Sequence, residues 1–407
     1  MKFYTLKLLH YFLQHNTSIA KTMVAAIKLL SFGRWKLKVV HCDWLDRYDG
    51  VASGVLREAS NGVSVCPWFY GLNKPNQIII HHPEVKFRLF EHAVISITSS
   101  SVLMSEGSLA IERVGREESM GIDYSGGHLL MHHGNSALVR DMEPMHINCG
   151  IFFGGNGAFN YYHWLIEIIS KSEFFNRLPY KNFPLLVSSD VDEIPSFNEI
   201  LRKFTSAYNV ILLKKNEAYR VERLIYIDAP NNLPFNLRLG EKLKAAQILI
   251  HNDSINYLRR TCLSPEVVNG GRGVVYHKKI FLKRKVERRK YNQDSVERIL
   301  QKHGFVNVYM EDLSFEEQIR TMYNAEWIVG PTGAAWTNLI FCRKGTKALC
   351  WMAEELGDFS VFSTIARNVG VDLKYITYHA GIHSTADAYH RDYRIDVDLI
   401  DKIVSGN

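Results

Sequence analysis

The six cysteines of this 407-residue sequence are scattered, with no CxxC pair and no close spacing. This pattern excludes a zinc ribbon and a disulfide framework, and it is typical of a protein from a reducing compartment. No apolar run reaches the roughly 18 residues of a membrane-spanning helix. Internal repeats and low-complexity tracts are also missing. At 46% apolar and 22% charged residues, the chain is expected to be globular and large enough for two domains.

Acidic residues are absent from the first 41 positions, which hold seven Lys or Arg. The rest of the chain has 42 basic and 42 acidic residues, so this arm accounts for the formal net charge of +7. Lys21 and Lys28 interrupt its apolar clusters, which argues against a secretory signal. Three interpretations stay open: a basic amphipathic helix on a membrane surface, a solvated helix pair covering the body, and an organellar transit peptide.

Short alternating runs between residues 65 and 140, such as NQIIIH and KFRLF, predict a β-rich region. From about residue 150 to 265, strand-like runs alternate with helical patterns, which predicts a Rossmann-like unit. A Gly-rich break at Val267–Val275 is interpreted as a linker. The helices expected in this first unit are Tyr161–Phe175, Pro195–Thr205 and Glu241–Arg260.

Beyond the break, five strand-like runs alternate with helical segments, which predicts a second doubly wound parallel sheet. The fold class expected is therefore α/β, with two Rossmann-like domains facing a cleft. A β-rich N-terminal region and a basic helical arm precede them. The strand-like runs are KIFLKR, VNVYM, EWIVG, KALCW and LKYITY, and the helices are Asp294–His303, Phe315–Asn324, Ala334–Phe341 and Asp358–Asn368.

The run EWIVGPTGAAWTNLIFC places a tight turn between a strand that ends at Gly330 and a helix that begins near Ala334. Backbone N–H groups and the positive helix end at this turn favour phosphate. Gly333 would allow its close approach, and Thr332 would add a hydroxyl. An ordinary strand–helix turn is the alternative interpretation.

A basic run, HKKIFLKRKVERRK at residues 277–290, holds eight Lys or Arg against one Glu. Residues just past a strand's carboxyl end face the crevice of an open α/β sheet, so these side chains are expected near Gly330. Arginine forks match a diphosphate better than lysine does. A solvated loop and a nucleic-acid patch are the alternatives, the latter weakened because only Tyr291 interleaves the charges. The residues concerned are Arg284, Lys285, Arg288 and Arg289.

The segment GGNGAFNYYHWLIEIIS, residues 154–170, joins a Gly-rich run to an aliphatic helix. With Asn160 as the cap, His163 lies in the first turn and Glu167 one turn further on the same face. A neutral imidazole in this place can accept a proton. The alternative is a histidine that only packs or caps. Trp164 and a neighbouring tyrosine offer flat apolar faces of the kind that pack on sugar rings.

Two motifs have competing explanations. Asp190 and Asp192 follow a buried strand at a spacing suited to a divalent metal, yet they also fit a turn that opens the next helix. Ser314 and Glu317 form a capping box, which is a complete structural account of Glu317. Gln318 points elsewhere, and its role stays open.

Four motifs occur in order: NYYHWLIE at 160–167, IFLKR…RRKYNQD at 280–294, GF…SFEEQI at 304–319 and VGPTGAAWTNLIF at 329–341. The set resembles the family-61 glycosyltransferases, whose bacterial members are often labelled capsular polysaccharide biosynthesis proteins. The resemblance covers about residues 60 to 380. It implies a GT-B architecture, inversion at the anomeric carbon, and a donor that is usually a UDP-sugar. It implies no essential metal, and no cofactor is expected.

The resemblance also implies roles for individual residues. The resemblance places His163 and Glu167 in the segment that faces the donor residues from the first domain. We expect His163 to be the catalytic base, assisted by Glu167. The acceptor side is expected at Asn160, Tyr162 and Trp164. The donor residues implied are Arg284, Arg289, Asn292, Glu317, Gln318, Gly330, Gly333, Ala334 and Asn338, and Thr332 joins them from the phosphate-binding turn.

This sequence departs from the family pattern at Thr332, where many relatives have His, and at Cys350, where they have an acid. The second departure concerns the nucleotide-ribose contact, for which Glu354 or Glu355 is a candidate substitute. Eukaryotic relatives usually have a signal-anchor, which is not found here. A bacterial cytoplasmic enzyme is therefore expected, and peripheral contact of residues 1–41 with the inner membrane stays one of the open interpretations of the arm.

The function expected is transfer of a sugar from a nucleotide diphosphate to a glycan or lipid-linked saccharide. The alternatives are a catalytically silent glycan- or nucleotide-binding subunit, a metal-dependent transferase using Asp190 and Asp192, and a nucleic-acid-binding protein. The expected divisions are an arm and lead-in at 1–60, an acceptor-side domain at 61–265, a nucleotide-sugar-binding domain at 276–385 and a tail at 386–407.

Overall fold

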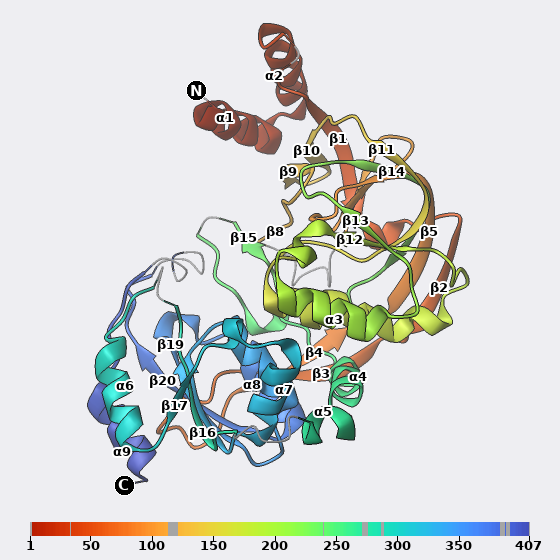
Figure 1. The fold of residues 1–407 in the computed structure, drawn as a ribbon. Helices are drawn as coiled ribbons and strands as arrows, with labels where there is room; N and C mark the ends of the chain where they lie inside the picture. The colour runs from red at the N-terminus through yellow and green to blue at the C-terminus, as the bar shows by residue number, and fades with distance from the viewer. Residues whose placement is uncertain are drawn as a thin grey trace.

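The computed structural model describes residues 2–32, 34–112, 121–238, 240–270, 276–285, 289–382, 387 and 391–406. A helical arm lies at one end of the molecule, next to a large mixed sheet, and a smaller parallel sheet lies at the other end (Figure 1). The mixed α/β character confirms that part of the predicted fold class. No helix within these ranges is long and apolar enough to cross a bilayer.

The arm is a hairpin of two helices, α1 (Lys2–His15) and α2 (Thr17–Leu30). Asn16 separates them, and its side chain caps α2 by accepting a hydrogen bond from the Ile19 N–H. The arm is seated on the large sheet through one apolar face. The buried residues of this contact are Leu9, Leu13, Ala20 and Val24 from the helices and Leu37 and Leu138 from the sheet.

The large sheet contains eleven strands within the described residues. Its main path runs β13-β12-β11-β14-β5-β6-β7-β1-β10-β9, and β2 pairs with β5. The strands are β1 (Leu37–Trp44), β2 (Ala52–Arg57), β5 (Val85–Ile95), β6 (Ser101–Leu103), β7 (Leu109–Ile111), β9 (Leu129–His133), β10 (Ser136–Arg140), β11 (Met145–Phe152), β12 (Leu185–Ser188), β13 (Val210–Leu213) and β14 (Tyr219–Ile227).

Four of these strands, β11 to β14, pair in parallel and form the Rossmann-like part of the sheet. Strand β14 then pairs antiparallel with β5 over eight residue pairs. The predicted β-rich region and the predicted α/β unit therefore share one continuous sheet. The helical elements in this part of the chain are η2 (His163–Ile168), η3 (Ile169–Arg177), η4 (Ser189–Asp192), α3 (Pro195–Thr205), α4 (Asn252–Cys262) and α5 (Pro265–Asn269).

The predicted helix Glu241–Arg260 is wrong in its first half. Only a short 3-10 turn, η5 (Ala245–Gln247), precedes α4, which begins at Asn252. The Asn232 and Leu249 backbones exchange two hydrogen bonds of 2.8 Å each, and the Asn231 side chain accepts the His251 N–H at 2.7 Å. These contacts hold the backbone extended until His251. Of the predicted linker, the first three residues belong to α5, and 271–275 lie outside the described residues.

The second sheet is entirely parallel, in the order β17-β16-β18-β19-β20. This confirms the predicted doubly wound sheet, and its strand order reverses between β16 and β18, where ligands bind in such folds. The strands are β16 (Lys279–Leu282), β17 (Val306–Val308), β18 (Trp327–Pro331), β19 (Lys347–Ala353) and β20 (Asp372–Tyr378). The helices are α6 (Gln293–Lys302), η6 (Met310–Asp312), α7 (Phe315–Asn324), η7 (Ala334–Phe341), η8 (Glu354–Leu356), α8 (Val361–Val369) and α9 (Val397–Ser405).

A hairpin from early in the chain, β3 (Ser60–Val65) and β4 (Gln77–His82), packs on the second α/β unit. The Val65 N–H donates to the Thr364 hydroxyl at 2.9 Å. Tyr375 of β20 donates to the Trp68 carbonyl at 2.8 Å, so this segment extends the edge of the second sheet. One apolar core continues through both α/β units, which places them in fixed contact. A further short pair joins β8 (Ile122–Asp123) to β15 (Asn236–Leu237).

Candidate functional site

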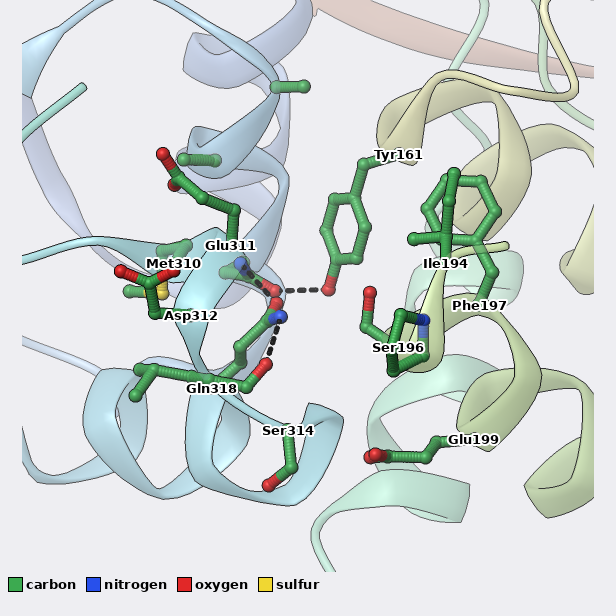
Figure 2. A pocket seen from close by; sticks show the side chains of 15 residues that line it. Tyr161, Ile194, Ser196, Phe197, Glu199, Met310, Glu311, Asp312, Ser314 and Gln318 are labelled. Carbon is green, nitrogen blue, oxygen red and sulfur yellow. Dashed lines mark hydrogen bonds between the residues drawn. The ribbon is translucent and has the colours of Figure 1, made fainter. Parts of the chain in front are cut away.

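A cavity of about 470 Å³ lies between the two α/β units. Figure 2 shows Tyr161, Ile194 and Phe197 on one side of it and Glu311, Asp312 and Gln318 on the other. The first side comes from the segment around Tyr161 and the start of α3. The second comes from η6, the start of α7 and the start of η7. The full lining is Tyr161, Ile194, Pro195, Ser196, Phe197, Glu199, Met310, Glu311, Asp312, Leu313, Ser314, Gln318, Ala334, Ala335 and Asn338.

A chain of hydrogen bonds crosses this cavity. The Tyr161 hydroxyl donates to Asn338 Oδ1 at 2.6 Å, and Asn338 Nδ2 donates to Gln318 Oε1 at 3.2 Å. Gln318 is in turn anchored to the Leu313 carbonyl at 3.1 Å. Burial raises the pKa of Tyr161, so its hydroxyl keeps the proton that it donates. The structure thus brings together the predicted Gln318 and Asn338 and adds Tyr161, which the sequence presented only as an aromatic face.

His163 and Glu167 form a buried pair on one helical face, with His163 Nδ1 and Glu167 Oε2 2.7 Å apart. The other carboxylate oxygen accepts the Leu233 N–H at 2.5 Å, which fixes the carboxylate. An ionised Glu167 would accept a hydrogen bond from Nδ1–H, and this arrangement would leave Nε2 as the ring atom able to accept a proton. The predicted placement of this pair is confirmed.

The helical segment that holds the pair is wound as a π-helix from His163 to Ile168. Residues 161–162, just before the π-helix, are helical too, and the Asn160 side chain caps them by accepting the Tyr162 N–H at 3.0 Å. Asn231, fully buried in the neighbouring loop, donates to the Ile166 carbonyl at 2.8 Å. Such π-helical turns occur frequently at functional sites, and here the turn is supported by a side chain about sixty positions away.

The Gly-rich run before this helix makes room for the imidazole. Gly157 has a φ of +76°, which favours glycine, and a Cβ there would lie 2.8 Å from the Cδ2 atoms of both His163 and Phe235. The His163 and Phe235 rings meet edge to face, with centroids 5.5 Å apart. The Gly157 backbone, the His163 imidazole and the Phe235 ring are therefore packed together at the end of the Gly-rich run.

A second cavity of about 540 Å³ opens beside Gly157 and Phe235. Ile194 lines both cavities, so the two adjoin. Phe159 is 56% exposed and meets Phe235 edge to face at 5.6 Å. Four charged residues stand around this cavity: Arg140, Asp190, Glu193 and Lys215.

Arg284 lies where the sequence predicted it, just past β16 and next to β18. Its Nη2 atom is buried and has no hydrogen-bond partner in the described part of the chain. A Cβ on Gly333 would lie 2.7 Å from this nitrogen, so the guanidinium sits against the turn that opens η7. Thr332 is buried in the same turn, and its N–H donates to the Trp351 carbonyl at 2.9 Å.

Aromatic rings cover the other side of this basic site. Tyr393 is stacked between Tyr291 and Tyr378, with centroids 5.1 and 3.8 Å away. Positive charge from Arg284 and Arg289 opposes the burial that raises the pKa of Tyr393. Arg289 has a left-handed backbone, with φ of +54°. The predicted Arg288 lies outside the described residues, and Lys285 is exposed and pairs with Asp312.

Several predicted donor residues have structural partners. Both polar atoms of the Asn292 amide bond the Ile395 backbone, at 3.0 Å each, and so hold the C-terminal segment. Glu317 closes the predicted capping box on Ser314 and does not line the cavity. Gly330 lets β18 approach β16, since a Cβ there would lie 2.9 Å from Leu282. Ala334 does line the cavity.

The acceptor-side prediction for Tyr162 and Trp164 needs correction. Their exposed fractions are 3% and 0%, and Trp164 stacks on Phe197 with ring planes 7° apart. Neither ring presents a face to a ligand, because the helix turns both into the core shared by the two units. The exposed ring in this part of the site is instead Phe159, which contacts Phe235, the ring next to His163. The sequence did not single out Phe159.

Both aspartates of the predicted metal motif have side-chain partners in the first unit. Asp190 pairs with Lys215 at 3.4 Å, and Asp192 accepts from the Asn198 amide at 2.8 Å. Among described residues, the one group with metal-ligand spacing is Glu354, Glu355 and His379. Glu355 already accepts backbone N–H bonds from residues 380–382, and Glu354 lies 2.5 Å from His379 Nδ1. Cys350 is buried, which raises the pKa of its thiol, so it offers no charge to a ligand.

Residues 161–349 match the family described as Glycosyltransferase 61. The matched span begins at the cavity residue Tyr161 and contains His163, Glu167, Arg284 and Asn338. It continues through the turn at Gly333 and ends in β19. No curated protein matches the chain. The match confirms the resemblance that the four sequence motifs indicated.

Proposed function

We propose that this chain, whose residues 161–349 belong to the glycosyltransferase 61 family, transfers a sugar from a nucleotide diphosphate to a saccharide, with inversion at the anomeric carbon. In this proposal the donor is a UDP-sugar, and the acceptor is a glycan or lipid-linked saccharide in surface polysaccharide synthesis. The adjoining cavities that share Ile194 support it, because a reaction of two substrates needs two neighbouring binding spaces.

The single observation that carries the proposal is the buried Nη2 of Arg284, which has no hydrogen-bond partner among the described residues. A buried donor without a partner costs free energy, and a phosphate oxygen would remove that cost through a charge-assisted hydrogen bond. Gly333 lets the guanidinium lie directly against this turn, since a Cβ there would be 2.7 Å from Nη2. The first N–H groups of η7 add a second set of donors at the same turn. The donor diphosphate is therefore assigned to this turn.

The chemistry assigned to the first unit is deprotonation of the acceptor. His163 Nε2 takes the proton of the acceptor hydroxyl as that oxygen bonds to the anomeric carbon. The bond from this carbon to the diphosphate oxygen breaks, and the nucleotide diphosphate leaves with the electron pair. Glu167 accepts the Nδ1–H bond and stabilises the imidazolium that forms. Arg284 and the start of η7 stabilise the charge on the leaving diphosphate.

The second cavity is assigned to the acceptor. Phe159 and Phe235 provide apolar ring surface next to His163. Asp190, Glu193 and Lys215 stand around the same cavity as partners for sugar hydroxyls. In this assignment Asp190 binds saccharide rather than a metal. Transfer that survives treatment with EDTA would support it, whereas transfer that requires a divalent cation would favour the Asp190 and Asp192 alternative.

A thermal-shift panel of nucleotide sugars tests the proposal directly. A UDP-sugar at 100 times its Kd should stabilise the chain by about 2.7 kcal/mol, and Arg284→Ala should lose most of that stabilisation. Arg298→Ala, on the exposed face of α6, is the matched control and should keep the shift. A panel in which no nucleotide sugar raises the Tm would contradict the donor assignment. Slow hydrolysis of the bound donor separates a transferase from a catalytically silent binding subunit.

A further inference from the structure

The helical arm is held in a defined orientation on the large sheet. Besides its apolar contact, Thr17 Oγ1 lies 3.2 Å from Ser136 Oγ, and Lys28 Nζ lies 3.4 Å from Asp141 Oδ2. Both partners belong to β10 or the residue after it. The last two residues of α2, Leu29 and Leu30, lie outside this contact and are exposed.

Three large apolar side chains stand in solvent where α2 ends. Leu29 and Leu30 are each 79% exposed, and Phe32 is 95% exposed. We call these three residues the α2 tip. They take no part in the buried contact between arm and sheet. Single exposed apolar residues are ordinary, but three within four positions form a patch of the kind that marks an interaction site.

Basic side chains surround the α2 tip, and acidic ones do not. Lys28 precedes the tip, Arg34 and Lys36 follow it, and all three are exposed. The first 41 residues contain no Asp or Glu. Asp141, directly after β10 of the sheet, is paired with Lys28. The tip is therefore apolar at its centre and positively charged at its edge.

We propose that the α2 tip docks on an anionic membrane surface. Leu29, Leu30 and Phe32 would enter the boundary between headgroups and acyl chains, while Arg34 and Lys36 bind lipid phosphates. A second copy of the chain is the less suitable occupant, because two arms free of acidic residues repel each other. The contact is peripheral, since no described helix is long and apolar enough to cross a bilayer.

Membrane docking would place the second cavity beside the bilayer. Arg140 lines that cavity, and the next residue, Asp141, pairs with Lys28 at the base of the tip. A lipid-linked saccharide could then reach the cavity without leaving the membrane. This consequence rests on the proposed function, whereas docking itself does not.

Vesicle co-sedimentation of the full chain tests the docking. Wild type should partition onto phosphatidylcholine vesicles that contain phosphatidylglycerol, and weakly onto phosphatidylcholine alone. The triple variant Leu29→Ser, Leu30→Ser, Phe32→Ser should lose at least about tenfold in partitioning, because it removes the inserted apolar groups. Arg34→Glu with Lys36→Glu should lose a similar factor and with it the preference for the anionic lipid.

Two control variants make comparable substitutions outside the arm. Ile79→Ser removes a side chain of matched exposure, 78%, from β4, and Lys181→Glu with Lys242→Glu reverses two exposed charges outside the arm. Both should partition as wild type does. The proposal is overturned if wild type does not partition, if the tip variant keeps full partitioning, or if wild type is a dimer that the tip variant converts to a monomer. Transfer to a soluble acceptor should be unchanged in the tip variant, so failure of docking and failure of the proposed function are distinguishable.

Discussion

Tyr161 of the first α/β unit donates a hydrogen bond of 2.6 Å to Asn338 of the second, across the cavity that separates them. Tyr161 precedes His163 by two positions, and Asn338 belongs to η7, the helix that begins after Gly333. The hydrogen bond therefore ties the segment that holds the imidazole to the segment that faces Arg284.

Replacing Tyr161 with Phe should destabilise the chain by about 1–3 kcal/mol, because Asn338 Oδ1 would lose its donor in a buried place. Urea unfolding measures the change. In a double-mutant cycle with Asn338→Ala, the two effects should not add, since both substitutions remove the same bond. Additive effects would show that the two side chains are not coupled.

Replacing His163 with Ala should lower the rate of transfer by about 10²–10⁴, because the acceptor hydroxyl would lose its base. The affinity for UDP should not change, since the donor diphosphate is assigned to the other unit. Transfer rates and UDP titration of the same preparation measure both. Glu167→Gln should lower the rate less, because the amide oxygen still accepts the Nδ1–H bond. Wild-type turnover in His163→Ala would refute the assignment of the base.

Replacing Gly157 with Ala should lower the transfer rate by more than its loss of folding stability alone would explain. The new methyl group would lie 2.8 Å from the imidazole Cδ2 and would displace the ring. Gly134→Ala is the matched control, because Gly134 also has a positive φ, of +52°, but nothing lies within 4 Å of an added Cβ. Each variant should lose about 1 kcal/mol of stability to backbone strain, and Gly157→Ala should lose more because its methyl group also crowds His163 and Phe235. Equal activity in the two would contradict the placement of His163.

Buried histidines in the β-rich region predict a loss of stability in acid. Burial lowers the pKa of His128 and of His132 from 6.5 to about 4. Between these values the unfolded chain binds protons that the folded chain does not, so stability is complete above pH 6.5 and falls as the pH drops toward 4. Each residue contributes up to about 3 kcal/mol over this window.

Urea unfolding as a function of pH measures this effect. His128→Gln should make the decline shallower, since one group that titrates only in the unfolded state is removed, at the expense of its contact with Ser101. A decline of the same steepness in wild type and variant would mean that His128 does not contribute. His303→Gln is a suitable control, because His303 is not buried and bonds Asp401 at 2.6 Å near the surface.

Local features of the sequence predicted much of the second unit. The helix Phe315–Asn324 has the predicted bounds because Ser314 and Glu317 cap each other, a signal contained in four residues. The helix Ala334–Phe341 also begins at the predicted residue, directly after the turn that ends at Gly333. The pair His163 and Glu167 could be predicted because residues four apart on a helix share a face. Each of these signals involves residues within about one helical turn of each other in the sequence.

Other features depended on residues far apart in the chain. The burial of Trp164 against Phe197, which removed it from the acceptor side, follows from how α3 packs. The extended backbone before α4 follows from pairing with the loop at Asn231 and Asn232. The sequence around residue 241 has helical propensity and gives no sign of this pairing. The hydrogen bonds to the other segment override the local helical propensity.

The sequence alone thus determined the type and order of most elements, the helical pair His163 and Glu167, and the charge of the arm. The tertiary structure decided which of those groups meet: Tyr161 with Asn338, Arg284 with the turn at Gly333, and the exposed α2 tip with its basic border. The physical reason is range. Caps and periodic patterns act within a few residues, whereas burial and unpaired donors are set by the order of strands in the two sheets.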